Sequence, residues 1–157
     1  MGIVKNKTME RIYVDTSVFG GYFEIEFEEW TKPFMEKFIT GEYKLLYSHI
    51  TEIELKKAPE QVRDLIKSIP VEHVEFLPVS DTAINLADQY IKENVVGKSS
   101  IDDCRHIAIA TLNNADILAS WNFKHIVNVT RIRGYNSINY KNGYKILEIR
   151  TPREIIS

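Results

Sequence analysis

The sequence predicts an α/β fold, a three-layer α/β/α sandwich around a mostly parallel sheet of about five strands. Two observations carry this prediction. Short runs of β-branched and aromatic residues, typical of buried strands, alternate with longer segments whose apolar residues recur at helical spacing. Polar residues also follow several strand-like runs directly, as they do where parallel strands end at a ligand-binding edge. At 157 residues, we expect one domain with one core.

The composition is that of an ordinary globular protein, with 44% hydrophobic and 27% charged residues. The single cysteine, Cys104, excludes an intramolecular disulfide and a cysteine-clustered zinc site, which favours a reducing compartment. No apolar run has the length of a signal peptide core or of a membrane span. We therefore expect a cytoplasmic protein with no membrane association, a flexible N-terminal extension over residues 1–9 and a single domain over residues 10–157.

The charge is divided unevenly along the chain. Residues 1–114 carry 13 Lys and Arg against 19 Asp and Glu, whereas residues 115–157 carry 7 against 3. The acidic part could hold cations and the basic part could contact phosphates. A solvated surface would explain the same imbalance, so charge alone leaves both interpretations open.

The first predicted strand, residues 12–14, ends at Asp15. The sequence leaves two roles open for Asp15. It could be the N-cap of a following short helix or turn over residues 17–23, or its carboxylate could face a ligand at the strand end while Thr16 or Ser17 caps the helix.

The other elements follow from periodicity, caps and breakers. Pro33 fits the first turn of a helix capped by Thr31, and Pro78 places the third strand at a sheet edge. The further strands are expected over residues 43–47, 74–79, 115–120 and 144–149. The further helices are expected over residues 31–41, from Ser48 to before Pro59, over 60–68, from Ser80 to near Gly97, from Ser100 onward and for one turn after Thr151.

Paired acids follow the second strand and begin the helix after Ser100. Glu52 and Glu54 lie two residues apart on a predicted helix, so they cannot both face one site. Asp102 and Asp103 lie in a first helical turn, where an acid gains about 0.3–1 kcal/mol from the helix dipole and Asp103 could complete a capping box.

Three side chains near these motifs are expected to be structural. Trp121 and Phe123 are interpreted as core anchors, and His106 as a structural hydrogen-bonding residue rather than a ligand. The residues Lys124 and His125, which follow, could be solvated surface or could contact phosphates.

Carboxylates gathered at one sheet edge repel one another unless cations neutralise them. Oxygen ligands with few histidines suit Mg²⁺ or Mn²⁺, and carboxylate-held metals can assist phosphodiester cleavage. The sequence lacks the GxGxxG and GxxxxGK[ST] phosphate loops, the HExxH zinc helix and the GxSxG elbow. These patterns favour a metal-dependent hydrolase over a dinucleotide-binding protein, a P-loop NTPase, a zinc metalloprotease or an α/β-hydrolase.

The chain resembles the PIN-domain ribonucleases, in particular the short VapC-like toxins of toxin–antitoxin pairs. The resemblance covers nearly the whole chain, and it depends on four segments in register rather than on any single motif. The four segments are Val14 to Ser17, Ser48 to Leu55, Asp103 to Ala110 and Ser120 to Ile126.

The resemblance implies a metal-dependent endoribonuclease with three catalytic acids, Asp15, Glu54 and Asp103, that hold Mg²⁺ or Mn²⁺. It selects Glu54 over Glu52, because the family acid lies six residues beyond the serine that ends the second strand. It selects Asp103 over Asp102, because the family acid lies three residues before the His-Ile-Ala segment.

The resemblance also assigns Ser17, Ser120 and Asn122 to positioning the substrate or the water on the metal. Asn122 departs from the wider family, in which this fourth position is commonly acidic, so a second metal would bind weakly or only with substrate. For the toxin branch the resemblance implies an RNA substrate, a homodimer and an antitoxin that blocks the site.

Two alternatives stay open. The presence of Asn122 and the basic tail would also fit a PIN-like module that binds RNA or a protein partner without catalysis. A deoxyribonuclease or structure-specific nuclease of related fold is less favoured, because the chain lacks room for the insertions that such enzymes usually carry.

Overall fold

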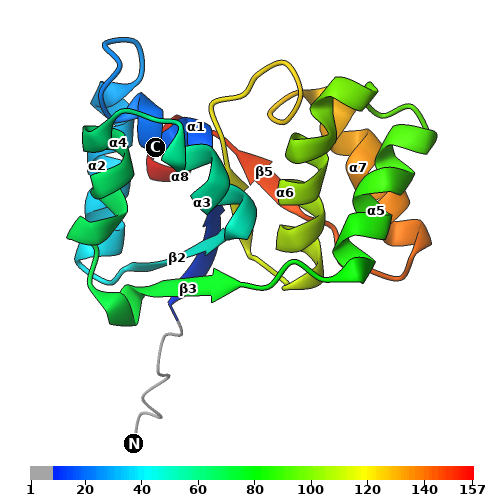
Figure 1. Cartoon of the computed structure of the whole chain (residues 1–157), viewed down its shortest axis with the longest axis horizontal. Helices are drawn as coiled ribbons and strands as arrows, with labels where there is room; N and C mark the ends of the chain where they lie inside the picture. Colours follow the sequence, from blue (N-terminus) through cyan, green and yellow to red (C-terminus); the bar gives the residue numbers. More distant parts are fainter. Residues whose placement is uncertain (1–8) are drawn as a thin grey trace, which may run out of the picture.

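The sheet at the centre of the molecule has five strands, all parallel, in the order β3-β2-β1-β4-β5 (Figure 1). The computed structural model describes residues 9–157, so the extension expected over residues 1–9 lies outside the described residues except for Met9. The strands are β1 (Glu10–Val14), β2 (Tyr43–Ser48), β3 (Val74–Leu77), β4 (Ile117–Ala119) and β5 (Glu148–Arg150). The predicted fold class is confirmed, including the edge position of β3.

Helices cover both faces of this sheet (Figure 1). One face is covered by α1 (Thr16–Gly21), α2 (Glu28–Ile39), α3 (His49–Lys56), α4 (Glu60–Asp64) and α8 (Pro152–Ile156). The other face is covered by α5 (Asp81–Lys92), α6 (Ile101–Leu112) and α7 (Val129–Lys141). Three short 3₁₀ turns connect them: Leu65–Ser68, Val71–His73 and Lys98–Ser100.

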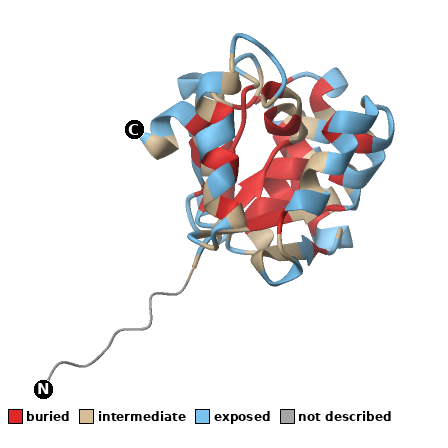
Figure 2. Ribbon diagram, turned by 90° about the vertical axis from the view of Figure 1, so that its left-hand side faces the viewer, coloured by how far each residue is buried: buried red, intermediate tan, exposed pale blue. Residues whose placement is uncertain are grey.

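The central strand β1 shows why the sheet forms here. Tyr13 packs into the core beneath α5, α6 and α7, whereas Ile12 and Val14 pack into the core beneath α1 and α2. All three side chains are fully buried, as expected for a parallel strand covered on both faces. Figure 2 shows the buried interior between outer helices whose far surfaces are exposed.

The start of α2 was predicted wrongly. The helix begins at Glu28, three residues before Thr31, and Pro33 lies inside it rather than in its first turn. Thr31 is not an N-cap, because it is buried and its hydroxyl donates to the Phe27 carbonyl at 2.8 Å. The same oxygen accepts from the Trp121 indole at 3.0 Å, so a tertiary contact decided its role.

Two other helices are shorter than predicted. The helix α5 ends at Lys92, because Asn94 adopts a positive φ of 61° and the chain turns there before it reaches Gly97. The helix expected over residues 60–68 is α-helical only to Asp64 and continues as a 3₁₀ turn.

The helix α7 was missed in the sequence. Its residues are rich in Asn, β-branched residues and Gly134, all weak helix formers, so tertiary packing of Tyr135 and Ile138 holds it. Asn128 caps it, accepting from the Arg131 amide at 3.2 Å. The strand β5 also begins later than predicted. Within residues 9–157, no helix is both long enough and apolar enough to cross a membrane.

Candidate active site at the carboxyl end of the sheet

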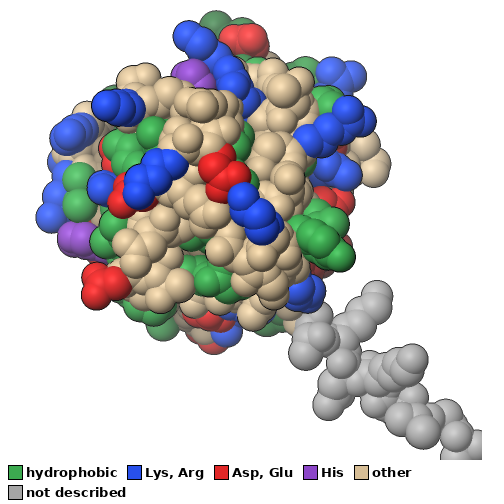
Figure 3. All heavy atoms as spheres, turned by 90° about the vertical axis from the view of Figure 1, so that its right-hand side faces the viewer, with side chains coloured by type: hydrophobic (Ala, Val, Ile, Leu, Met, Phe, Trp, Pro, Cys, Tyr) green, Lys and Arg blue, Asp and Glu red, His purple; other side chains and the backbone are tan. Residues whose placement is uncertain are grey.

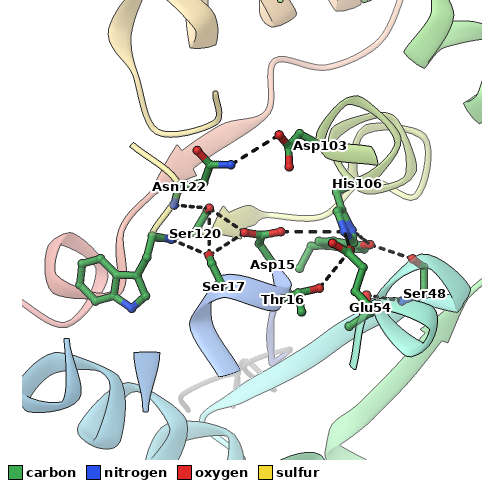
Figure 4. A network of polar contacts seen from close by, with 12 residues as sticks. Asp15, Thr16, Ser17, Ser48, Glu54, Asp103, His106, Ser120 and Asn122 are labelled. Carbon is green, nitrogen blue, oxygen red and sulfur yellow. Dashed lines mark hydrogen bonds and ion pairs between the residues drawn. The ribbon is translucent and has the colours of Figure 1, made fainter. Parts of the chain in front are cut away.

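Asp15 lies where β1 ends, and its side chain is almost fully buried. It occupies the N-cap position of α1, yet its carboxylate makes no capping hydrogen bond, and neither Thr16 nor Ser17 is the cap. The carboxylate instead accepts two hydroxyl hydrogen bonds on Oδ2, from Ser17 at 2.6 Å and from Ser120 at 2.9 Å (Figure 4). The side chain is therefore held by tertiary contacts and oriented at the strand end.

The same two serines fix the segment after β4. Ser17 Oγ accepts the backbone N–H of Trp121 at 3.0 Å, and Ser120 Oγ accepts that of Asn122 at 2.9 Å. Each hydroxyl thus joins the Asp15 carboxylate to the loop that carries Asn122. This arrangement positions Asn122 relative to Asp15 without a direct bond between them.

A cavity of about 480 Å³ opens at this edge of the sheet. Five of the six site residues predicted from sequence line it, and Ser120 is buried beside it on Asp15. The lining includes Asp15, Ser17, Glu54, Asp103 and Asn122, together with Thr16, Gly20, Phe23 and Glu24. The fold thus brings together side chains from β1, α1, α3, α6 and the loop after β4.

Glu54 faces this cavity and Glu52 does not. Glu54 Oε1 accepts from the Thr16 hydroxyl at 3.1 Å and from the His106 ring in a short contact. Glu52 lies on another side of α3, pairs with His49 at 3.5 Å and lines a different cavity.

His106 connects the site to the core. Its ring is fully buried, with Nε2 on Glu54 and Nδ1 2.6 Å from the Tyr13 hydroxyl, which in turn lies 2.8 Å from the Ser48 hydroxyl. Burial opposes the charged ring, but the pKa of His106 is raised well above its ordinary value by Tyr13, Glu54 and Asp15. Its Nε2 is 3.9 Å from Asp15 Oδ1. The predicted hydrogen-bonding role of His106 is confirmed, and its partner is a site carboxylate.

Asp103 lies in the first turn of α6, and its carboxyl group is the third predicted acid of the site. Burial, and then the nearby charge of Asp15, raise its pKa to about 6, and Glu54 adds to this while His106 opposes it. The Asn122 amide reaches Asp103 Oδ2 at a long 3.5 Å. Ser100 makes no side-chain capping bond, so the capping box is not formed. Asp102 points outward toward Arg105 at 3.7 Å.

The donor set fits a hard divalent cation by its chemistry. It consists of carboxylate oxygens, and the pKa of Asp103 is raised by burial and then by the charge of Asp15, two effects that a bound cation would offset. In the part of the chain that the structure describes, however, no three His, Cys, Asp or Glu side chains are gathered closely enough to hold a metal ion. Glu54 is turned toward His106 instead.

Several residues at the site were not singled out from the sequence. Thr16 and Tyr13 bond Glu54 and His106, and Phe23 and Glu24 line the cavity from the segment after α1. No spacing signal marks them, because their roles depend on neighbours far along the chain. Phe123, predicted as a core anchor, is 52% exposed, so that prediction was wrong, whereas Trp121 is buried as expected.

No family model and no curated protein matches the chain. Solved structures share its fold, among them the following two. A chain of VapBC2 from Rickettsia felis, bound to a DNA fragment from their promoter, is 15% identical with a TM-score of 0.53, over 90% of this chain and 98% of that one. A chain of DNA-bound VapBC from Salmonella typhimurium is 16% identical with a TM-score of 0.54, over 92% of this chain and 99% of that one. These similarities confirm the predicted PIN-like fold.

Proposed function

We propose that this protein is a metal-dependent endoribonuclease that hydrolyses RNA phosphodiester bonds as the toxin of a type II toxin–antitoxin pair. One observation carries the proposal: Asp15, Glu54 and Asp103, from three separate segments, line one cavity at the carboxyl end of a parallel sheet. The similarity of the fold to chains of VapBC complexes supports it.

In this proposal Asp15, Asp103 and Glu54 would hold Mg²⁺ or Mn²⁺. Asn122 would help to position the substrate or the water on the metal, since its amide nitrogen faces Asp103 and its amide oxygen accepts the His125 N–H at 3.0 Å. The metal would supply Lewis-acid activation of water and neutralise charge on the phosphate. Ser17 and Ser120 keep the Asp15 carboxylate in a fixed orientation, because both hydroxyls donate to its Oδ2. His106 and Thr16 hold the Glu54 carboxylate at the cavity.

The test is cleavage of single-stranded RNA by purified protein with Mn²⁺ or Mg²⁺, and with EDTA as the metal-free control. The parent is compared with Asp103→Asn and with the matched variant Asp102→Asn, whose parent side chain is 60% exposed. We expect Asp103→Asn to abolish most cleavage and Asp102→Asn to retain it. Equal rates for both variants, or cleavage that EDTA does not stop, would contradict the proposal. Matched DNA strands would identify a deoxyribonuclease.

A second function is favoured by one observation. Glu54 is bonded to His106, and no three ligating groups are gathered within residues 9–157, as expected for a PIN-like module that binds RNA or a protein without catalysis. Calorimetric titration with Mn²⁺ separates the two functions. A catalytic site should bind Mn²⁺ and lose it on Asp15→Asn, whereas a binding module need not bind Mn²⁺ at all.

The toxin role further implies an antitoxin, a homodimer and a cytoplasmic location. The similar solved structures are VapBC complexes bound to DNA, which supports a protein partner for this chain. Co-expression with the product of a small neighbouring gene, followed by co-purification and inhibition of cleavage, tests this part. Light scattering of the purified chain tests the dimer.

A further inference from the structure

A cluster of aromatic rings lies beside the candidate active site. Phe27 and Trp121 are stacked with their centroids 4.4 Å apart, and Phe123 lies 6.1 Å from Trp121 and 6.2 Å from Phe27. Trp121 is 7% exposed, whereas Phe123 is 52% exposed. The buried Trp121 and the half-buried Phe27 therefore support an outer ring that is open to a ligand.

This outer ring directly follows a residue of the candidate active site. Phe123 follows Asn122 directly in the chain, and Asn122 lines the cavity that holds Asp15 and Asp103. A second exposed ring, Phe23, lines the same cavity from the segment after α1. Large aromatic side chains at a polar site, exposed without a core role, are the kind that contacts flat ligands.

Acidic and basic residues both occur in the segments around Phe123. The segment before α2 carries Glu24 and Glu26, which would repel a phosphate backbone. Lys124 directly follows Phe123, and Lys124 and Arg131 lie close enough to His125 that their charges, after burial, help to lower its pKa. Figure 3 shows Lys and Arg side chains spread over the side of the molecule that α5 and α7 form. A polyanion is therefore favoured on the side of Lys124.

We propose that Phe123 stacks on an unpaired base of single-stranded RNA next to the phosphodiester bond that lies at Asp15 and Asp103. In this arrangement Phe23 contacts a second base and Lys124 faces the backbone. The proposal rests on the proposed function for the identity of the polymer and adds that the RNA must be unpaired. In a duplex the base faces are covered by their neighbours, so Phe123 would find no free face on which to stack.

The experiment measures binding and cleavage separately. Binding uses a short fluorescein-labelled single-stranded RNA and the full chain carrying Asp15→Asn, so that the RNA stays intact, and it compares Phe123, Phe123→Ala and Phe123→Trp by anisotropy. The matched control is Tyr140→Ala, an aromatic ring that is 77% exposed on α7. We expect Phe123→Ala to weaken binding on the order of tenfold, and Phe123→Trp and Tyr140→Ala to change it less than about twofold. Thermal unfolding checks that each variant is folded.

Cleavage is then measured with the chain in which Asp15 is intact. The substrates are a series of RNAs, each of which lacks the base at one position along the strand. Removal of the stacked base should lower kcat/KM about as much as Phe123→Ala, and the two losses should not add, because they remove the same contact. RNA in a perfect duplex should be cleaved at least about tenfold more slowly.

The outcomes separate the two proposals. Binding that depends on Phe123 without any cleavage would leave the stacking contact standing and contradict the proposed function. Cleavage with Phe123→Ala equal to the parent would contradict the stacking contact alone and would point to a protein partner for this exposed ring. A parent chain that binds no RNA would contradict both.

Discussion

Two cavities are each lined in part by α3 and α4, and the three acids predicted to bind metal all line the smaller one. The larger, of about 690 Å³, is lined mainly by apolar side chains such as Leu55 and Phe76, with Lys56 and Arg63 among its polar residues. The smaller, of about 480 Å³, holds Asp15, Glu54 and Asp103. Its position at the ends of parallel strands, rather than its size, makes it the candidate active site.

The helix α3 contributes one acid to each cavity. Glu54 faces the smaller cavity and is bonded to Thr16 and His106, whereas Glu52 lines the larger one and pairs only with His49. Two residues of displacement along a helix rotate a side chain by about 200°, so neighbouring acids of identical chemistry have different surroundings. The pair therefore provides a controlled comparison of the two cavities.

The largest expected effect is that of Asp15→Asn on RNA cleavage. Asp15 is held by two hydroxyls at the centre of the smaller cavity, and loss of residues that merely support metal ligands costs about 10- to 100-fold, so we expect a loss on the order of 100-fold or more. Initial rates with Mn²⁺ measure it, and circular dichroism checks the fold. Retention of more than a tenth of the parent rate would remove Asp15 from the catalytic set.

The next effect compares the two glutamates of α3. Glu54→Gln should lower kcat/KM by about 10- to 100-fold, because the carboxylate is lost from the smaller cavity, while Glu52→Gln should leave it within about twofold. Both variants are assayed on one RNA at one metal concentration. If Glu52→Gln were the more impaired variant, the assignment of the two cavities would be reversed.

A smaller effect concerns stability. The pKa of Asp103 is about 6 in the folded protein against an ordinary 3.8, so its charged form disfavours folding. This cost is absent below about pH 4, grows as the pH rises toward about 6 and is complete above it. Without divalent metal near pH 7, Asp103→Asn should therefore stabilise the protein by about 1 kcal/mol after allowance for solvent screening, or roughly 2–4 °C in Tm.

The measurement is calorimetric unfolding at several pH values, with Asp102→Asn as the exposed control. The gain from Asp103→Asn should shrink toward zero near pH 4, where the parent carboxyl is also neutral. A gain that persists there would assign the effect to packing and not to charge. Added Mn²⁺ should stabilise the parent more than the variant, because only the parent keeps all three carboxylates.

The smallest effect is expected at the larger cavity. Val71 is 87% exposed and lines it, so Val71→Ser should change stability by no more than about 0.5 kcal/mol and cleavage by less than about twofold. The same assays measure both quantities. A strong loss of cleavage would show that the larger cavity takes part in catalysis or in substrate binding.

The parallel strands were predictable because each has buried apolar, β-branched or aromatic residues, as burial on both faces requires. Errors concentrate where a tertiary contact outweighs local preference. Thr31 was predicted as a cap, but its hydroxyl is used by Trp121 and the helix starts earlier. The helix α7 was missed because its residues are weak helix formers that pack through Tyr135 and Ile138. Asn94 ends α5 by a positive φ that no local pattern announced.

By itself, the sequence determined the parallel α/β class and the carboxylates that follow the strands, because hydrophobic periodicity and strand ends are local properties. Through family register it also proposed Glu54 over Glu52 and Asp103 over Asp102. Only the tertiary structure decided that Ser17 and Ser120 orient Asp15, that His106 holds Glu54, and that burial beside Asp15 raises the pKa of Asp103. These properties arise between residues that are up to about a hundred positions apart, where only folding sets distance and burial.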